Sequence, residues 1–180
     1  MYNIYMDERT KNTIYWAAIG SAVYGVITGV SSFVSFRFFT FGPTGGEIGD
    51  LIALGMKTNA FGFGDFIQNI IFSIIGGAIG GAISSIFFDF WLKLARILFG
   101  WAFNMTNIFQ LYFYPSLAVW IVFGILGGLS GLGFFGGIVF WLINLIGGII
   151  GIYVFATLMQ QGVGKYYDPI IQGSASNTNG

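Results

Sequence analysis

The side chains of this chain that could carry out chemistry are few, and the two most versatile kinds are missing. The sequence has seven basic and seven acidic residues, with no histidine and no cysteine. Without histidine, the commonest general base and any His-based catalytic triad are excluded. Without cysteine, thiolate nucleophiles, disulfides and most zinc sites are excluded as well. We therefore expect no catalytic residues, no metal and no cofactor, and we expect that the protein is not an enzyme.

The remaining candidates for chemistry are carboxylates in one connector and a single amide in an apolar run. A catalytic carboxylate pair would need two of Glu47, Asp50 and Asp65 to converge, and no motif favours that arrangement. Asn144 is the one amide well inside an apolar segment. Such an amide either forms a hydrogen bond across helices or lines a substrate path, and the first is the favoured interpretation.

The composition indicates an integral membrane protein. Hydrophobic residues make up 56% of the 180 residues and charged residues only 8%, against about 25% charged in an average soluble domain. The formal net charge is zero, and no basic stripe or recognition motif is present, so a nucleic-acid partner is excluded. We expect membrane lipids and protein helices as the partners.

Four apolar runs are long enough to cross a bilayer core of about 30 Å at about 1.5 Å per residue. The sequence predicts an all-α, polytopic transmembrane bundle with spans at about residues 13–36, 66–88, 112–129 and 135–159. The last two spans are separated by a glycine cluster at residues 127–133. A polar N-terminal tail (1–12) and a polar C-terminal tail (161–180) flank this domain, with disorder expected in residues 174–180. Residues 47–56 form either a short interfacial helix or an ordinary loop.

The segment between the second and third spans is amphipathic. It carries the basic residues Lys93 and Arg96 beside the aromatic residues Trp91 and Trp101. Basic residues with aromatic anchors are typical of a helix that lies in the membrane interface. The alternative is a fifth span across residues 97–113.

The distribution of positive charge predicts the orientation. With four spans, one side of the membrane holds both termini and the middle segment, and five basic residues fall there: Arg9, Lys11, Lys93, Arg96 and Lys165. The other side holds Arg37 and Lys57. Because cytoplasmic loops are enriched in Lys and Arg, we expect both termini in the cytoplasm.

Glycine is the most distinctive feature of the sequence. The chain has 29 glycines, about twice the average share, and many lie four residues apart. Such GxxxG pairs expose bare backbone on one helix face, where another helix can approach closely. The glycines that we expect to pack helices, as in a glycine zipper, are Gly25, Gly29, Gly76, Gly77, Gly80, Gly81, Gly124, Gly128, Gly147 and Gly151. They pack either the chain's own bundle or a partner, including a second copy.

The second half of the chain resembles a known family. The run LKLARILFG (92–100), the step from Tyr112 to Pro115, and the stretches LIGGIIG (145–151) and GVGK (162–165) are similar to the Yip domain family of small multi-spanning membrane proteins. The resemblance covers residues 90–166. It implies membrane organisation or vesicle trafficking with protein partners and no catalysis, and the family's usual five spans support the five-span alternative.

Three functions are compatible with the sequence. The first is a non-catalytic membrane scaffold or adaptor that works through Gly-rich helix packing, Yip-like or not. The second is a small accessory subunit of a larger membrane complex or of a lipid-containing viral envelope. The third is an oligomeric channel or transporter.

Overall fold

The structure is a computed structural model that describes residues 7–41, 63–129 and 132–176. In these residues it contains only helices, namely α1 (Glu8–Phe41), α3 (Phe63–Ser85), α4 (Phe88–Phe99), α5 (Ile108–Leu129) and α6 (Leu132–Ser176). Four of them, α1, α3, α5 and α6, are long and apolar enough to cross a membrane. The prediction of an all-α bundle with four spans is confirmed.

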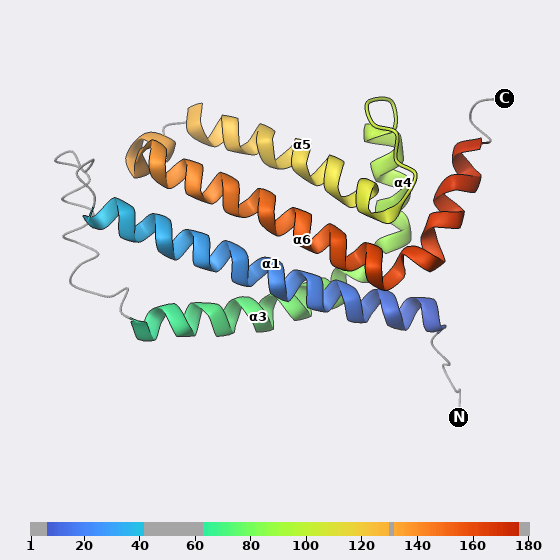
Figure 1. The fold of residues 1–180 in the computed structure, drawn as a ribbon, viewed down its shortest axis with the longest axis horizontal. Coiled ribbons are helices and arrows are strands. Elements are labelled where there is room, and N and C mark those ends of the chain that lie inside the picture. The colour runs from blue at the N-terminus through green and yellow to red at the C-terminus, as the bar shows by residue number, and fades with distance from the viewer. Residues whose placement is uncertain (1–6, 42–62, 130–131, 177–180) are drawn as a thin grey trace.

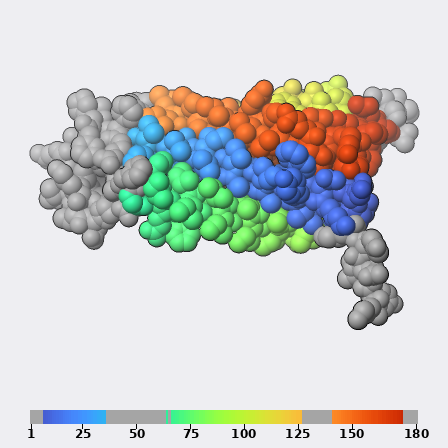
Figure 2. Space-filling view, turned by 60° about the horizontal axis from the view of Figure 1, so that its bottom comes forward, coloured from blue at the N-terminus to red at the C-terminus, as the bar shows by residue number. Residues whose placement is uncertain are grey.

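The four long helices lie side by side in an order that differs from their order in the sequence. Helices α1 and α6 pack against each other in the centre, α3 packs against α1, and α5 packs against α6. The space-filling view also shows α1 between α6 and α3 (Figure 2). Helix α3 is therefore at one edge of the bundle and α5 is at the other.

The amphipathic segment forms the short helix α4. Its 12 residues extend about 18 Å, which is too short to cross the bilayer core. Figure 1 shows α4 running across the direction of the long helices, at the end of the bundle where α1 begins and α6 ends. The chain then leaves the helical conformation between Gly100 and Asn107. The alternative of a fifth span across residues 97–113 was therefore wrong.

Two helices extend further than the apolar runs that predicted them. Helix α1 begins at Glu8, inside the expected polar tail, and α6 continues to Ser176, well beyond Gln160. The extension of α6 is stabilised by packing, since Tyr167 and Ile171 are almost fully buried. Of the segment expected to be disordered, residues 174–176 belong to α6, and residues 177–180 lie outside the described residues, as do residues 47–56.

Helix α6 changes direction near its C-terminal end (Figure 1). Its 45 residues would extend about 68 Å if straight, more than twice the bilayer core. Pro169 lies within this last part of the helix. Proline lacks the backbone N–H, and its ring crowds the carbonyl four residues earlier, so a proline is a common cause of a bend in a helix.

The best-packed part of the bundle is the end where α4 lies. Seven buried residues from four helices form one cluster there: Ala17, Phe88, Ile108, Met159, Val163, Tyr167 and Ile171. The rings of Tyr112 and Tyr167 flank Phe88 at centroid distances of 5.6 and 4.5 Å. This cluster fixes the start of α4 against α5 and α6.

Candidate functional site

The predicted glycines of α1 and α3 lie at very close contacts between the two helices. A methyl group added at Gly77 would lie 2.5 Å from the carbonyl oxygen of Ser21, and one at Gly25 would lie 2.7 Å from that of Ser73. A methyl group at Gly81 would meet the carbonyl oxygen of Ala17. These neighbours are backbone atoms, which move only if the whole helix moves. The two helices therefore pack backbone against backbone, a geometry that only glycine permits.

The neighbouring glycines Gly76 and Gly80 are in a different situation. A methyl group added at either position would meet no atom of the described residues within 4 Å. Both residues are exposed, and so are Ile79 and Ile83, which share their face of α3 by helical spacing. The GGxxGG motif (residues 76–81) therefore contains two pairs of glycines with different surroundings. Gly77 and Gly81 pack against α1, and Gly76 and Gly80 face outward.

The glycines of α6 receive side chains from the central helix α1. The hydroxyl of Ser31 lies over Gly147, and the ring of Tyr24 lies over Gly151. Gly162, which was not among the predicted positions, lies under the indole ring of Trp16. These contacts are between a flat or small side chain and bare backbone, so they differ from the backbone contacts of α1 and α3.

The other predicted glycines make looser or undescribed contacts. A methyl group at Gly29 would lie at an ordinary 3.4 Å from the hydroxyl of Ser73, and one at Gly124 would lie 2.9 Å from the Cδ1 atom of Leu145. Gly128 belongs to α5, but its surroundings lie outside the described part of the structure.

Asn144 forms hydrogen bonds between α6 and α1. Its amide nitrogen donates to the hydroxyl of Ser35 at 2.8 Å, and its amide oxygen accepts from the hydroxyl of Ser32 at 3.1 Å. Ser35 is fully buried. This is the cross-helix role that the sequence favoured for Asn144.

The four predicted interfacial anchors point in different directions. Lys93, on α4, is exposed, and Trp101, in the turn after α4, is 86% exposed, so both face outward. Arg96 instead donates a hydrogen bond to the carbonyl of Ile171 on α6, and burial lowers the pKa of its guanidinium. Trp91 also faces inward, and its buried indole N–H has no hydrogen-bond partner among the described residues.

Side chains from α6 cap the first turn of α5. The carboxylate of Asp168 accepts from the backbone N–H of Ile108 at 2.9 Å, and the amide oxygen of Gln160 accepts from that of Phe109 at 2.9 Å. Asn107 accepts from the N–H of Gln110 at 2.8 Å. The first backbone N–H groups of a helix lack partners inside the helix, so these acceptors stabilise its start.

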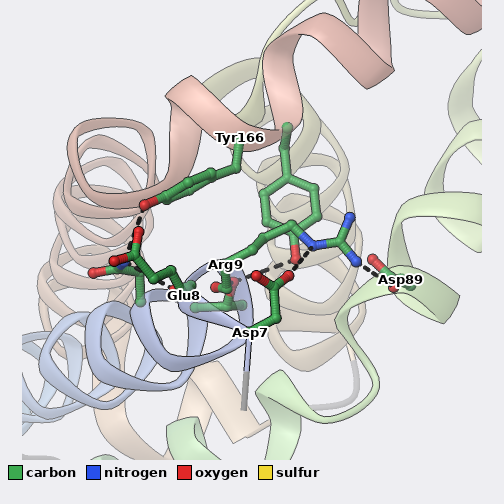
Figure 3. A network of polar contacts seen from close by, with 8 residues as sticks. Asp7, Glu8, Arg9, Asp89 and Tyr166 are labelled. Atoms are coloured by element: carbon green, nitrogen blue, oxygen red, sulfur yellow. Dashed lines mark hydrogen bonds and ion pairs between the residues drawn. The ribbon is translucent and has the colours of Figure 1, made fainter. Parts of the chain in front are cut away.

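A second polar network joins the start of α1 to α4 and α6 (Figure 3). The guanidinium of Arg9 lies between the carboxylates of Asp7 and Asp89, at 3.9 and 3.7 Å, and over the ring of Tyr167 at 5.2 Å. The hydroxyl of Tyr166 accepts from Asn12 at 3.2 Å. Because both acidic partners are mostly exposed, the network fixes geometry more than it adds stability.

A cavity of about 330 Å³ lies between the helices. Its walls include four aromatic residues, one from each of α1, α4, α5 and α6: Tyr24, Trp91, Trp120 and Phe155. Three of these rings lie against a glycine of a neighbouring helix, Tyr24 on Gly151, Trp120 on Gly148 and Phe155 on Gly20. Sequence reasoning missed this cavity, because spacing within one helix does not show which ring meets which glycine.

The carboxylates that were candidates for catalysis are not brought together in the described residues. Glu47 and Asp50 lie outside the described residues, and Asp65 belongs to the first turn of α3. Among the described residues, no group of three or more acidic side chains is placed to hold a metal ion.

The fold defines a multi-pass integral membrane protein with four helices that can span the bilayer. No protein-family model, curated protein or solved structure matches the chain. The resemblance of residues 90–166 to the Yip domain family therefore stays a prediction.

Proposed function

We propose that this protein is a non-catalytic membrane scaffold or adaptor, and that it binds a transmembrane helix of another protein on the outer face of α3. This outer face consists of Gly76, Ile79, Gly80 and Ile83. The observation that carries the proposal is the open position of Gly76 and Gly80 beside the tightly packed Gly77 and Gly81.

The cost of glycine in a helix supports this proposal. In a helix interior, glycine is about 1 kcal/mol less favourable than alanine. At Gly77 and Gly81 the close approach of α1 compensates for that cost, since any larger residue would force the helices apart. At Gly76 and Gly80 the described part of the chain offers no such compensation. A partner helix that approaches the bare backbone would supply it.

The position of α3 in the bundle also supports a docking role. Among the described helices, α3 makes extensive contacts only with α1, so its outer face is available at the edge of the bundle (Figure 1). Lipid gives helices little hydrophobic reason to associate, so close packing at small residues has to provide the affinity. We expect a partner helix to approach Gly76 and Gly80 as closely as α1 approaches Gly77 and Gly81.

The orientation belongs to the same proposal. The start of α1, helix α4 and the C-terminal part of α6 lie at one end of the bundle (Figure 1). They carry five basic residues, namely Arg9, Lys11, Lys93, Arg96 and Lys165. We place this end, with both termini, in the cytoplasm by the bias of Lys and Arg.

Site-directed crosslinking tests the proposed contact. The natural chain has no cysteine, so Ile79→Cys introduces a single thiol on the outer face of α3. Ile74→Cys is the matched control, because Ile74 is also exposed but lies on the opposite side of the same helix. In native membranes we expect Ile79→Cys, and not Ile74→Cys, to crosslink to a peptide from a transmembrane segment of one defined partner.

A second substitution distinguishes a specific contact from random collision. Adding Gly76→Leu and Gly80→Leu to the Ile79→Cys chain covers the bare backbone and should abolish the crosslink. A crosslink that persists in this background would contradict the proposal. A crosslink between two copies of this chain would also contradict it, because the protein would then be a homo-oligomer.

A further inference from the structure

The cavity between α1, α4, α5 and α6 is built for an uncharged, apolar occupant. None of the eight side chains that line it in the described part of the chain carries a formal charge. Besides the four rings, the walls include the aliphatic residues Val119 and Ile152 and the serines Ser21 and Ser116. A volume of about 330 Å³ is at the small end of the range for cavities that bind organic molecules.

Water is a poor occupant for such a cavity. A buried water molecule needs two to four polar partners, and most of the wall of this cavity is apolar. An empty cavity is unfavourable too, because the atoms on its walls lose their dispersion contacts. Since the walls are mostly apolar, hydrocarbon satisfies them better than water or vacuum.

The place of the cavity in the bundle indicates where the hydrocarbon comes from. Tyr24 lies thirteen residues after Lys11, and Ile152 lies thirteen residues before Lys165, so both lie about 20 Å along their helices from these charges. That distance reaches the central part of a bilayer core of about 30 Å. Trp91, on the short helix α4, lines the cavity from the end of the bundle that carries the termini. The cavity is partly open, and at this depth the surrounding medium consists of acyl chains.

The walls hold their shape through glycine contacts. The rings of Tyr24 and Phe155 lie so close to Gly151 and Gly20 that an added methyl group would be 2.7 and 2.8 Å away. The indole N–H of Trp120 donates to the carbonyl of Leu145 at 3.2 Å. Rings held in this way keep the cavity from collapsing, so it stays open to the surrounding medium.

We propose that this cavity binds one acyl chain of a membrane lipid, which fills the space between Trp91, Trp120 and Phe155. The bound acyl chain then forms part of the packing between α5 and the two central helices, α1 and α6. This proposal does not depend on the docking of a partner helix, because α3 does not line the cavity.

Photolabelling in vesicles tests the proposal. The probe is a phosphatidylcholine with a diazirine in its acyl chain, diluted into unlabelled phosphatidylcholine vesicles that contain the protein. Adducts on Ile152 and Phe155 are measured relative to adducts on Ile150, which is exposed on the same helix. Val119→Trp fills the cavity from α5. Val122→Trp is the matched control, since Val122 is exposed on the same helix and does not line the cavity.

We expect the ratio of cavity adducts to Ile150 adducts to fall about tenfold in Val119→Trp, which corresponds to about 1.4 kcal/mol of binding free energy. The ratio should be unchanged in Val122→Trp. Ser116→Phe fills the same cavity from a different position, and should reproduce the loss if Val119→Trp fails to fold. An unchanged ratio in the folded cavity-filling variants would overturn the proposal. So would labelling that occurs only with a free fatty acid probe, because the occupant would then not be a membrane lipid.

Discussion

Two adjacent glycines of α3 allow a direct test of the packing described above. Gly76→Ala and Gly77→Ala introduce the same methyl group one residue apart. At Gly77 the new methyl would lie 2.5 Å from the carbonyl oxygen of Ser21, whereas an ordinary contact begins at 3.4 Å. Helices α1 and α3 must therefore separate by about 0.9 Å at this position. At Gly76 the methyl would meet none of the described atoms within 4 Å.

The free-energy difference between the two variants isolates the packing cost. Both variants gain the same helix propensity, up to about 1 kcal/mol in a helix interior, so this contribution cancels in the comparison. What remains is the cost of overpacking, typically about 1–3 kcal/mol, together with lost Cα–H···O contacts of about 0.5–1 kcal/mol each. We therefore expect Gly77→Ala to be less stable than Gly76→Ala by about 1–3 kcal/mol.

The assay is reversible thermal unfolding of the purified protein in mixed micelles, followed by circular dichroism. Gly76→Ala should unfold at or slightly above the wild-type midpoint, and Gly77→Ala clearly below it. For a chain of this size, each kcal/mol lowers the midpoint temperature by about 2–4 °C. Equal midpoints for the two variants would refute the claim that α1 and α3 pack backbone against backbone at this position.

Three further predictions follow from the polar contacts and from the charge distribution. Asp168→Ala should destabilise the protein by about 1–2 kcal/mol in the same unfolding assay, because the buried N–H of Ile108 loses its acceptor; an unchanged midpoint would show that this cap does not stabilise α5. Asn144→Leu should cost about 0.6–1.7 kcal/mol through the lost hydrogen bonds to Ser32 and Ser35, and a stabilised variant would contradict the assigned contact. A single cysteine in place of Lys93 should react with a membrane-impermeant maleimide only from the cytoplasmic side, and labelling from the other side would reverse the proposed orientation.

The number of spans and the all-α fold could be predicted because both depend on the length of apolar runs. The bilayer sets a minimum length for a span, so α3 and α5 were located within a few residues. The glycine cluster at residues 127–133 also placed the break between α5 and α6 correctly.

The ends of the helices and the division of the glycines could not be predicted, because both depend on neighbours that are distant in the sequence. Helix α6 continues past Gln160 since Tyr167 and Ile171 pack against α4 and α5, which hydropathy along one helix does not show. The spacing of Gly76, Gly77 and their partners is identical on both faces of α3. Only the position of α1 decides which pair is packed and which pair is open.

We propose that the open glycines of α3 hold a partner helix, and the mass of the native complex is the most direct test of this contact. The complex is extracted gently with detergent for the wild type, for Gly76→Leu/Gly80→Leu, and for Gly64→Leu, a substitution at another open glycine of α3. We expect a defined partner in addition to the 19.6 kDa chain in the wild type and in Gly64→Leu, and its loss in the double variant. A wild-type chain that is extracted alone, or a partner that stays bound in the double variant, would contradict the claim.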